Sequence, residues 1–254
     1  SVPEHPATKV KVLKWRETLD AFGKVVVGEL TAPFDQSQCQ RMECEMGNLV
    51  ADAMLYARRN RPEVRAAIIN AGGVRAGLDV GTVRVENVNI VLPFLNALLD
   101  FDLTGKQLIY MLETVLAKTN RENGRPITSF VQVSGLKIAF DMLRPEYDRV
   151  TEVWVRKAGP ITIQSPAADE FELLVPDTVY TFVTADFILD GGDGFFATPP
   201  AHSEPLDMMA DVLANYIRAA TPVSPKRDNR LQSANGPISS MARHEICHLY
   251  SDCE

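Results

Sequence analysis

The sequence predicts one α+β domain with a mixed sheet, preceded by a helix and followed by a polar tail. Two observations lead to this prediction. Segments of helical and of strand periodicity follow one another without the strict alternation of a doubly wound fold. After Thr221, the composition changes to Pro, Ser, Asn and charged residues. We therefore divide the chain into an N-terminal segment at 1–22, a domain at 23–221 and a weakly ordered tail at 222–254.

Each element is predicted from the spacing of its apolar residues. A helical period predicts helices at 9–22, 48–59 and 205–219. A fourth helix is expected after Thr104, because Thr104 and Gln107 have the spacing of a capping box. β-branched or alternating residues predict strands at 24–32, 65–70, 96–103, 130–141, 149–157 and 177–185. The segment 85–92 is compatible with either a helix or a strand.

The composition limits the classes of function. Hydrophobic residues make up 46% of the 254-residue chain and charged residues 23%, which is typical of a chain that buries a core. No apolar run is long enough to cross a bilayer, so we expect a soluble chain. The formal net charge of −7 argues against nucleic-acid binding, which depends on clustered Lys and Arg. A small anionic ligand would have to be held by a few local arginines.

Two strand-to-glycine loops are candidate ligand-binding segments. The first, Asn70–Arg75, combines an amide, backbone N–H groups that glycine leaves accessible, and a guanidinium suited to phosphate or hydroxyl groups. The second, at 187–194, carries aspartates that can accept hydroxyl hydrogens from a ribose, and it lacks the spacing of a P-loop. Taken alone, the first loop is better explained as an ordinary tight turn, and the second could equally be a structural or calcium-like turn.

Phe94 and Phe187 lie beside the two loops in the sequence. Two facing phenylalanine rings can hold a nucleobase between them by stacking. The alternative is that both rings belong to the hydrophobic core, which is the usual place of a single phenylalanine. Their position next to both glycine loops favours the base-stacking hypothesis.

The cysteines occur as two close pairs, Cys39/Cys44 and Cys247/Cys253. The spacing favours bonds between neighbours, which would indicate an oxidising compartment, but free thiols are equally compatible with it. The chain begins at Ser1 without Met, a basic leader or an apolar segment, as expected of a processed or excised chain.

The segment His244–His248 matches the H-E-x-x-H pattern of zinc peptidases. It lies in the polar tail after a segment that would form a poor buried helix. Only His5 and His202 remain as further histidines, so a zinc peptidase is the least favoured hypothesis. None of the four histidines occurs in the settings that build a two-metal phosphoesterase centre. We therefore expect no metal ion and no catalytic residue in this chain.

Six short motifs occur in a fixed order along the chain: ECEMGNLVADAM at 43–54, INAGGVR at 69–75, VLPF at 91–94 followed by Asn96, LTG at 103–105, QVSG at 132–135 and DFILDGGDGF at 186–195. Together they resemble the motifs of the C-terminal domain of the family of 5′-nucleotidases, apyrases and UDP-sugar hydrolases. Within this family, the six motifs most resemble those of the secreted or ecto-5′-nucleotidases. The helix at 9–22 resembles the interdomain helix of that family.

The resemblance implies a four-layer α/β/β/α domain with a mixed sheet and a nucleotide-binding site. It implies that Phe94 and Phe187 enclose the nucleobase, and that Arg75 and Asp193 hold the ribose or nearby phosphate oxygens. Further contacts to the base are implied for two residues of the first glycine loop, Asn70 and Gly73.

The resemblance also implies a disulfide between Cys39 and Cys44, as in the animal ecto-5′-nucleotidases and salivary apyrases. In those proteins a basic residue directly follows the first cysteine and touches the ligand. Here that position is Gln40, with Arg41 next. We expect either that Arg41 takes over the contact with a shifted side chain or that the contact is lost.

The resemblance assigns this chain the substrate-binding and specificity half of a hydrolase that dephosphorylates nucleoside 5′-phosphates. The catalytic metallophosphoesterase domain, with two divalent metal ions expected to be zinc, would be N-terminal to it in the same parent chain. We expect the fragment alone to be inactive, to bind an AMP- or adenosine-like ligand, and to be extracellular. The alternative is a stand-alone nucleotide- or nucleoside-binding module.

Overall fold

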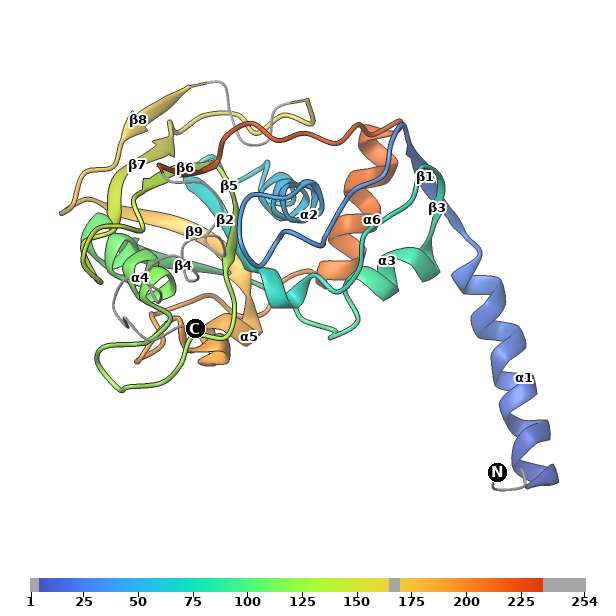
Figure 1. The fold of residues 1–254 in the computed structure, drawn as a ribbon. Helices are drawn as coiled ribbons and strands as arrows, with labels where there is room; N and C mark the ends of the chain where they lie inside the picture. The colour runs from blue at the N-terminus through green and yellow to red at the C-terminus, as the bar shows by residue number, and fades with distance from the viewer. Residues whose placement is uncertain (1–4, 165–169, 235–254) are drawn as a thin grey trace, which may run out of the picture.

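The computed structural model describes residues 5–164 and 170–234 (Figure 1). Its helices are α1 (Pro6–Gly23), α2 (Glu45–Tyr56), α3 (Val85–Val91), α4 (Gly105–Ala117), α5 (Asp186–Leu189) and α6 (Met209–Ala220). The predicted helices at 9–22 and after Thr104 are α1 and α4, and the motifs at 43–54 and 186–195 include most of α2 and all of α5. Thr104 caps α4 as expected, with reciprocal hydrogen bonds between Thr104 and Gln107.

Two four-stranded mixed sheets form the body of the molecule. The first has the order β4-β9-β2-β5 and consists of β4 (Leu98–Thr104), β9 (Val179–Ala185), β2 (Val64–Asn70) and β5 (Val131–Ser134). The second has the order β10-β6-β7-β8 and consists of β10 (Leu231–Ser233), β6 (Leu136–Phe140), β7 (Val150–Arg156) and β8 (Phe171–Leu173). A separate pair joins β1 (Val26–Leu30) to β3 (Gly81–Arg84). This mixture of helices and sheets confirms the predicted α+β class.

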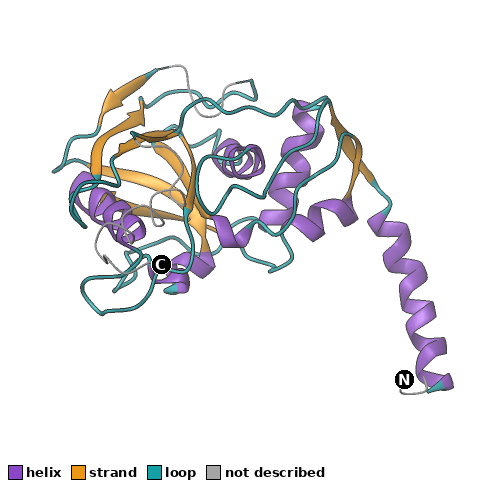
Figure 2. Ribbon diagram, viewed as in Figure 1, coloured by secondary structure: helices purple, strands orange, loops and turns teal. Residues whose placement is uncertain are grey.

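The helices pack around these sheets. Helix α2 contacts β2 and β5, α6 packs on α2, and α4 contacts β4 and β7. Figure 2 shows the strands of both sheets gathered on one side of the molecule with α2 and α6 beside them. Helix α1 extends away from this body, and Trp15 on it is exposed (Figure 1). No helix in the described ranges is long and apolar enough to span a membrane.

The predicted strand at 130–141 is two strands in two different sheets. Gly135 separates β5 from β6 and has a φ of +79°, in the left-handed region that glycine adopts without steric cost. The periodicity of the apolar residues continues through the glycine, so the sequence pattern does not reveal the break. This corner connects the first sheet to the second.

The structure changes the boundary of one predicted helix and decides the type of one ambiguous segment. The helix expected at 205–219 begins only at Met209, because Leu206 and Asp207 exchange backbone hydrogen bonds with Leu98 of β4. The ambiguous segment at 85–92 is the helix α3.

The expectation of a weakly ordered tail from residue 222 is wrong for residues 222–234. Val223 forms backbone hydrogen bonds with Glu29 and Thr31, and β10 extends the second sheet in parallel to β6. Arg230 in this segment is only 2% exposed. The segment is held by this buried cation together with two buried apolar side chains, Val223 and Leu231, and the polar residues around them made the composition misleading. The H-E-x-x-H segment and Cys247/Cys253 lie outside the described residues.

Candidate functional site

A cavity of about 740 Å³ opens at one edge of the first sheet. Strands β2 and β9 are neighbours and run in parallel, so their carboxyl ends meet at the same edge. Asn70 ends β2 and is followed directly by the first glycine loop, whereas Ala185 ends β9 and the short helix α5 leads from it to the glycines of the second loop. Ligand sites commonly form outside the carboxyl ends of such strands. The sheet therefore brings together two loops that are more than a hundred residues apart in the sequence.

Six of the seven residues predicted for the site line this cavity. They are Asn70, Gly73, Arg75, Phe94, Phe187 and Asp193. The cavity is also lined by residues that the sequence analysis did not assign to the site, among them Phe22, Gln40, Asn96, Thr128, Met208 and Asp211. Arg41 is exposed and is not part of the lining.

Asp193 is held by hydrogen bonds from both sides of the cavity. The Asn70 Nδ2 atom donates to its Oδ2 atom at 2.6 Å, and the Thr128 hydroxyl donates to its Oδ1 atom at 2.5 Å. Asp193 has a φ of +54° between Gly191 and Gly194, which both also have positive φ. This unusual backbone conformation turns the carboxylate toward Asn70 at the end of β2. The carboxylate retains lone pairs that can accept hydrogen bonds from a ligand.

The two phenylalanine rings lie at the surface and not in the core. Phe94 is 56% exposed and Phe187 is 42% exposed, and both line the same cavity. The Arg75 guanidinium lies over the Phe94 ring, 5.7 Å from its centroid, and donates to the Gly72 carbonyl at 3.2 Å. The core alternative for these rings is therefore wrong.

Asp186 connects the segments that carry the two rings. Its Oδ1 atom accepts hydrogen bonds from the Asn96 amide at 2.6 Å and from the Phe187 backbone N–H at 2.7 Å. Its Oδ2 atom accepts from the backbone N–H of Ala97. A side chain at Gly192 would overlap the Phe187 ring, so this position requires glycine. These contacts fix the backbone on both sides of the cavity.

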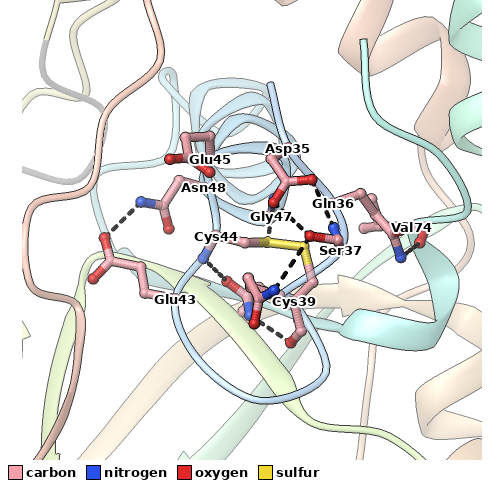
Figure 3. Close-up of a disulfide and its surroundings, with 12 residues drawn as sticks. Asp35, Gln36, Ser37, Cys39, Glu43, Cys44, Glu45, Gly47, Asn48 and Val74 are labelled. Atoms are coloured by element: carbon pink, nitrogen blue, oxygen red, sulfur yellow. Dashed lines mark hydrogen bonds between the residues drawn. A yellow bond between two sulfur atoms is a disulfide. The ribbon is translucent and has the colours of Figure 1, made fainter. Parts of the chain in front are cut away.

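The Cys39–Cys44 disulfide is present and closes the loop that carries Gln40 (Figure 3). The Cys44 sulfur caps α2 by accepting from the Gly47 N–H at 3.1 Å. The buried Gln132 side chain bridges the loop: its amide nitrogen donates to the Cys39 and Met42 carbonyls. The loop is thereby held against β5 at the side of the cavity.

The charges of the cavity are few. Among the described residues that line it, Arg75 is the one cation, and Asp193 and Asp211 are the carboxylates. No group of three or more His, Cys, Asp or Glu side chains that could hold a metal ion occurs within residues 5–164 and 170–234. The groups that line the cavity are suited to stacking on and hydrogen bonding to a small ligand.

The structure is thus an α+β domain with a cavity at the carboxyl ends of two parallel strands. Residues 26–198 match the family model described as 5′-nucleotidase, C-terminal domain, and the chain belongs to this family. This result confirms the resemblance inferred from the six motifs.

The chain is similar in sequence to a 5′-nucleotidase-related protein and an apyrase, and similar in structure to a bacterial 5′-nucleotidase precursor. The chain is 30% identical over 230 residues to a 5′-nucleotidase-related protein of Glossina morsitans morsitans, which covers 85% of this chain. It is 28% identical to an apyrase of Tabanus yao, which covers 91% of this chain. The crystal structure of a 5′-nucleotidase precursor from Thermus thermophilus matches with 30% identity and a TM-score of 0.73 over 93% of this chain.

The chain spans less than half the length of these proteins. It covers 40% of the Glossina protein, 42% of the Tabanus apyrase and 45% of the Thermus structure. The similarity is thus to one domain of larger proteins.

Proposed function

We propose that this chain is the substrate-binding and specificity domain of a hydrolase that dephosphorylates nucleoside 5′-phosphates. The observation that carries the proposal is the convergence of Phe94, Phe187, Arg75 and Asp193 on one cavity beside the ends of two parallel strands. In this proposal, the two rings stack on the base, and the Asp193 carboxylate accepts hydrogen bonds from the ribose hydroxyls. Arg75 contacts the ribose or a nearby phosphate oxygen, and Asn70 and Gly73 contact the base.

The chemistry itself is assigned to another domain. The proposal places the metal ions and the bond-breaking residues on an N-terminal metallophosphoesterase domain of the parent chain. The domain described here would supply orientation, which lowers the entropic part of the barrier. The Cys39–Cys44 disulfide supports an extracellular location for the parent.

Replacing Phe187 with alanine should weaken binding of adenosine and AMP to the chain by about 1–3 kcal/mol, or about 5- to 150-fold in Kd. The ring is exposed in the cavity, so its removal takes away stacking area without opening the core. Isothermal titration of the wild type and the variant without added metal measures the effect. Hydrolysis of AMP by the chain alone is expected at the background rate.

Trp154→Ala is a matched control for this titration. Trp154 is also an exposed aromatic residue, but it lies on β7 of the second sheet and does not line the cavity. We expect the control to bind as the wild type does. Equal binding by the wild type and Phe187→Ala would remove the assignment of the site.

A further inference from the structure

We infer that Asp186 is a positioning residue for base binding, whose carboxylate sets the gap between the Phe94 and Phe187 rings. The inference rests on the proposed function, because it takes a nucleobase to be held between these two rings. It adds to that proposal a residue that works from behind the site. Asp186 is not among the described residues that line the cavity, so it acts through the rings and not by touching the ligand.

The Phe187 ring is carried by backbone that the Asp186 carboxylate binds directly. The Asp186 Oδ1 atom accepts a hydrogen bond from the Phe187 backbone N–H at 2.7 Å. Helix α5 begins at Asp186 and has four residues, and the N–H groups in the first turn of a helix have no partner within the helix. The ring itself lies against Gly192, where an added Cβ would overlap it. The carboxylate and the glycine together fix the place of this ring.

The segment that carries the Phe94 ring is held by the same carboxylate. The Asn96 amide donates to the Asp186 Oδ1 atom at 2.6 Å, and the Ala97 backbone N–H donates to the Oδ2 atom at 3.0 Å. Between Phe94 and Asn96 the chain turns at Leu95, which has a φ of +55° in the left-handed region. A residue other than glycine stays in this region only where its surroundings hold it there. Loss of the carboxylate should therefore release the turn that carries Phe94.

Asp186 lies where the sheet stops holding the two segments together. The antiparallel register between β4 and β9 ends at the pair Leu98 and Ala185. One residue further along β9, the Asp186 N–H donates to the Ala97 carbonyl at 2.9 Å, and its carboxylate accepts the three hydrogen bonds described above. Hydrogen bonds to a charged acceptor are about twice as strong as neutral ones. A gap that is set in advance in this way costs less conformational entropy when a base enters it.

The test is a double-mutant cycle on adenosine binding, measured by isothermal titration with the full 254-residue chain. Asp186→Ala should weaken adenosine binding about 3- to 30-fold, a large part of the loss expected from removing a ring itself. In the Phe187→Ala background the same change should weaken binding less than about 2-fold, because a single ring leaves no gap to be set. Thermal unfolding of each variant checks that it is folded at the temperature of the titration.

A second cycle with Asp193→Ala separates positioning of the rings from support of the whole loop. Asp193 is proposed to bind the ribose, which does not depend on the gap between the rings. The effects of Asp186→Ala and Asp193→Ala on adenosine binding should therefore multiply to within about 2-fold. Equal coupling of Asp186 to Phe187 and to Asp193 would show that it merely holds the loop in place, and would overturn the inference.

Two further variants complete the experiment. Asp186→Asn replaces one acceptor oxygen by an NH₂ donor, so in either orientation of the amide at least one N–H group loses its acceptor. It should show the same coupling to Phe187 with a smaller loss, and it carries the test if Asp186→Ala does not fold. Asp141→Ala is the matched control: Asp141 directly follows β6 as Asp186 follows β9, accepts the Leu143 backbone N–H at 2.8 Å and does not line the cavity. It should bind adenosine as the wild type does.

The outcomes separate this inference from the proposed function. If Phe187→Ala weakens adenosine binding but Asp186→Ala changes it no more than Asp141→Ala does, Asp186 is not a positioning residue and the proposed function stands. If Asp186→Ala costs as much in the Phe187→Ala background as in the wild type, the inference is likewise overturned. Equal binding by the wild type and Phe187→Ala, or no binding by the wild type, would overturn the proposed function and this inference with it.

Discussion

Replacing Arg230 with alanine is expected to lower the free energy of unfolding by about 3–5 kcal/mol, because it leaves the Asp52 carboxylate without its partner in a buried site. The Arg230 guanidinium donates to both oxygens of Asp52, at 2.7 and 3.0 Å, and to Asp228 at 2.6 Å. Burial lowers the pKa of Arg230, but the carboxylates of Asp52 and Asp228 outweigh it and leave that pKa above its usual value. Urea denaturation at neutral pH measures the change.

Arg227→Ala is the control for this prediction. Arg227 is three residues away and pairs with Glu45 at 2.7 Å, but its side chain is 41% exposed, compared with 3% for Arg230. Surface ion pairs contribute about 0–1 kcal/mol, so this variant should be nearly as stable as the wild type. The double variant Arg230→Ala/Asp52→Ala should lose less than the sum of its single changes, because it removes the unpaired charge as well. A loss in Arg230→Ala no larger than in Arg227→Ala would contradict the prediction.

Replacing Gly135 with alanine should destabilise the fold by about 2–5 kcal/mol, from left-handed backbone strain and from overpacking. The added Cβ would overlap the Arg65 carbonyl oxygen and approach Ala66 of β2. Because Gly135 is the corner between β5 and β6, the strain would act on both sheets at once. Thermal and chemical denaturation of the variant measure the loss.

Gly124→Ala separates the two contributions. Gly124 also has a positive φ, +69°, but a Cβ there would meet nothing within 4 Å. This variant should therefore show the backbone strain alone, about 1–2 kcal/mol. If Gly135→Ala is no less stable than Gly124→Ala, the close approach at the sheet corner does not matter for stability.

Much of the fold and of the cavity was predictable because the sequence pattern of single strands and helices agrees with the way these elements pack. The buried strand at 65–70 ends in a glycine loop, and so does the strand at 177–185. A parallel arrangement of such strands places both loops at one edge, and the structure has this arrangement between β2 and β9. The capping box at Thr104 was equally clear because all its partners lie within one turn of helix.

The features that sequence reasoning missed depend on contacts between distant residues. Nothing near Arg230 in the sequence indicates that Asp52, far earlier in the chain, provides its partner. Thr128 reaches Asp193 from a polar loop that carries no recognisable pattern. Gln40 lines the cavity and Arg41 does not, and this depends on the shape of a disulfide-bonded loop that is held by contacts with the distant residues Phe130 and Gln132.

The walls of the cavity are drawn from positions as far apart as Phe22 and Asp211. No short stretch of the polypeptide contains enough of them to retain a ligand, so a nucleoside would have no comparable affinity for the unfolded ensemble. Occupancy is then thermodynamically linked to folding of the domain as a whole: at a free concentration one hundred times Kd, the native state would gain about 2.7 kcal/mol. A protein of this design would be most resistant to heat and proteolysis while it holds its ligand.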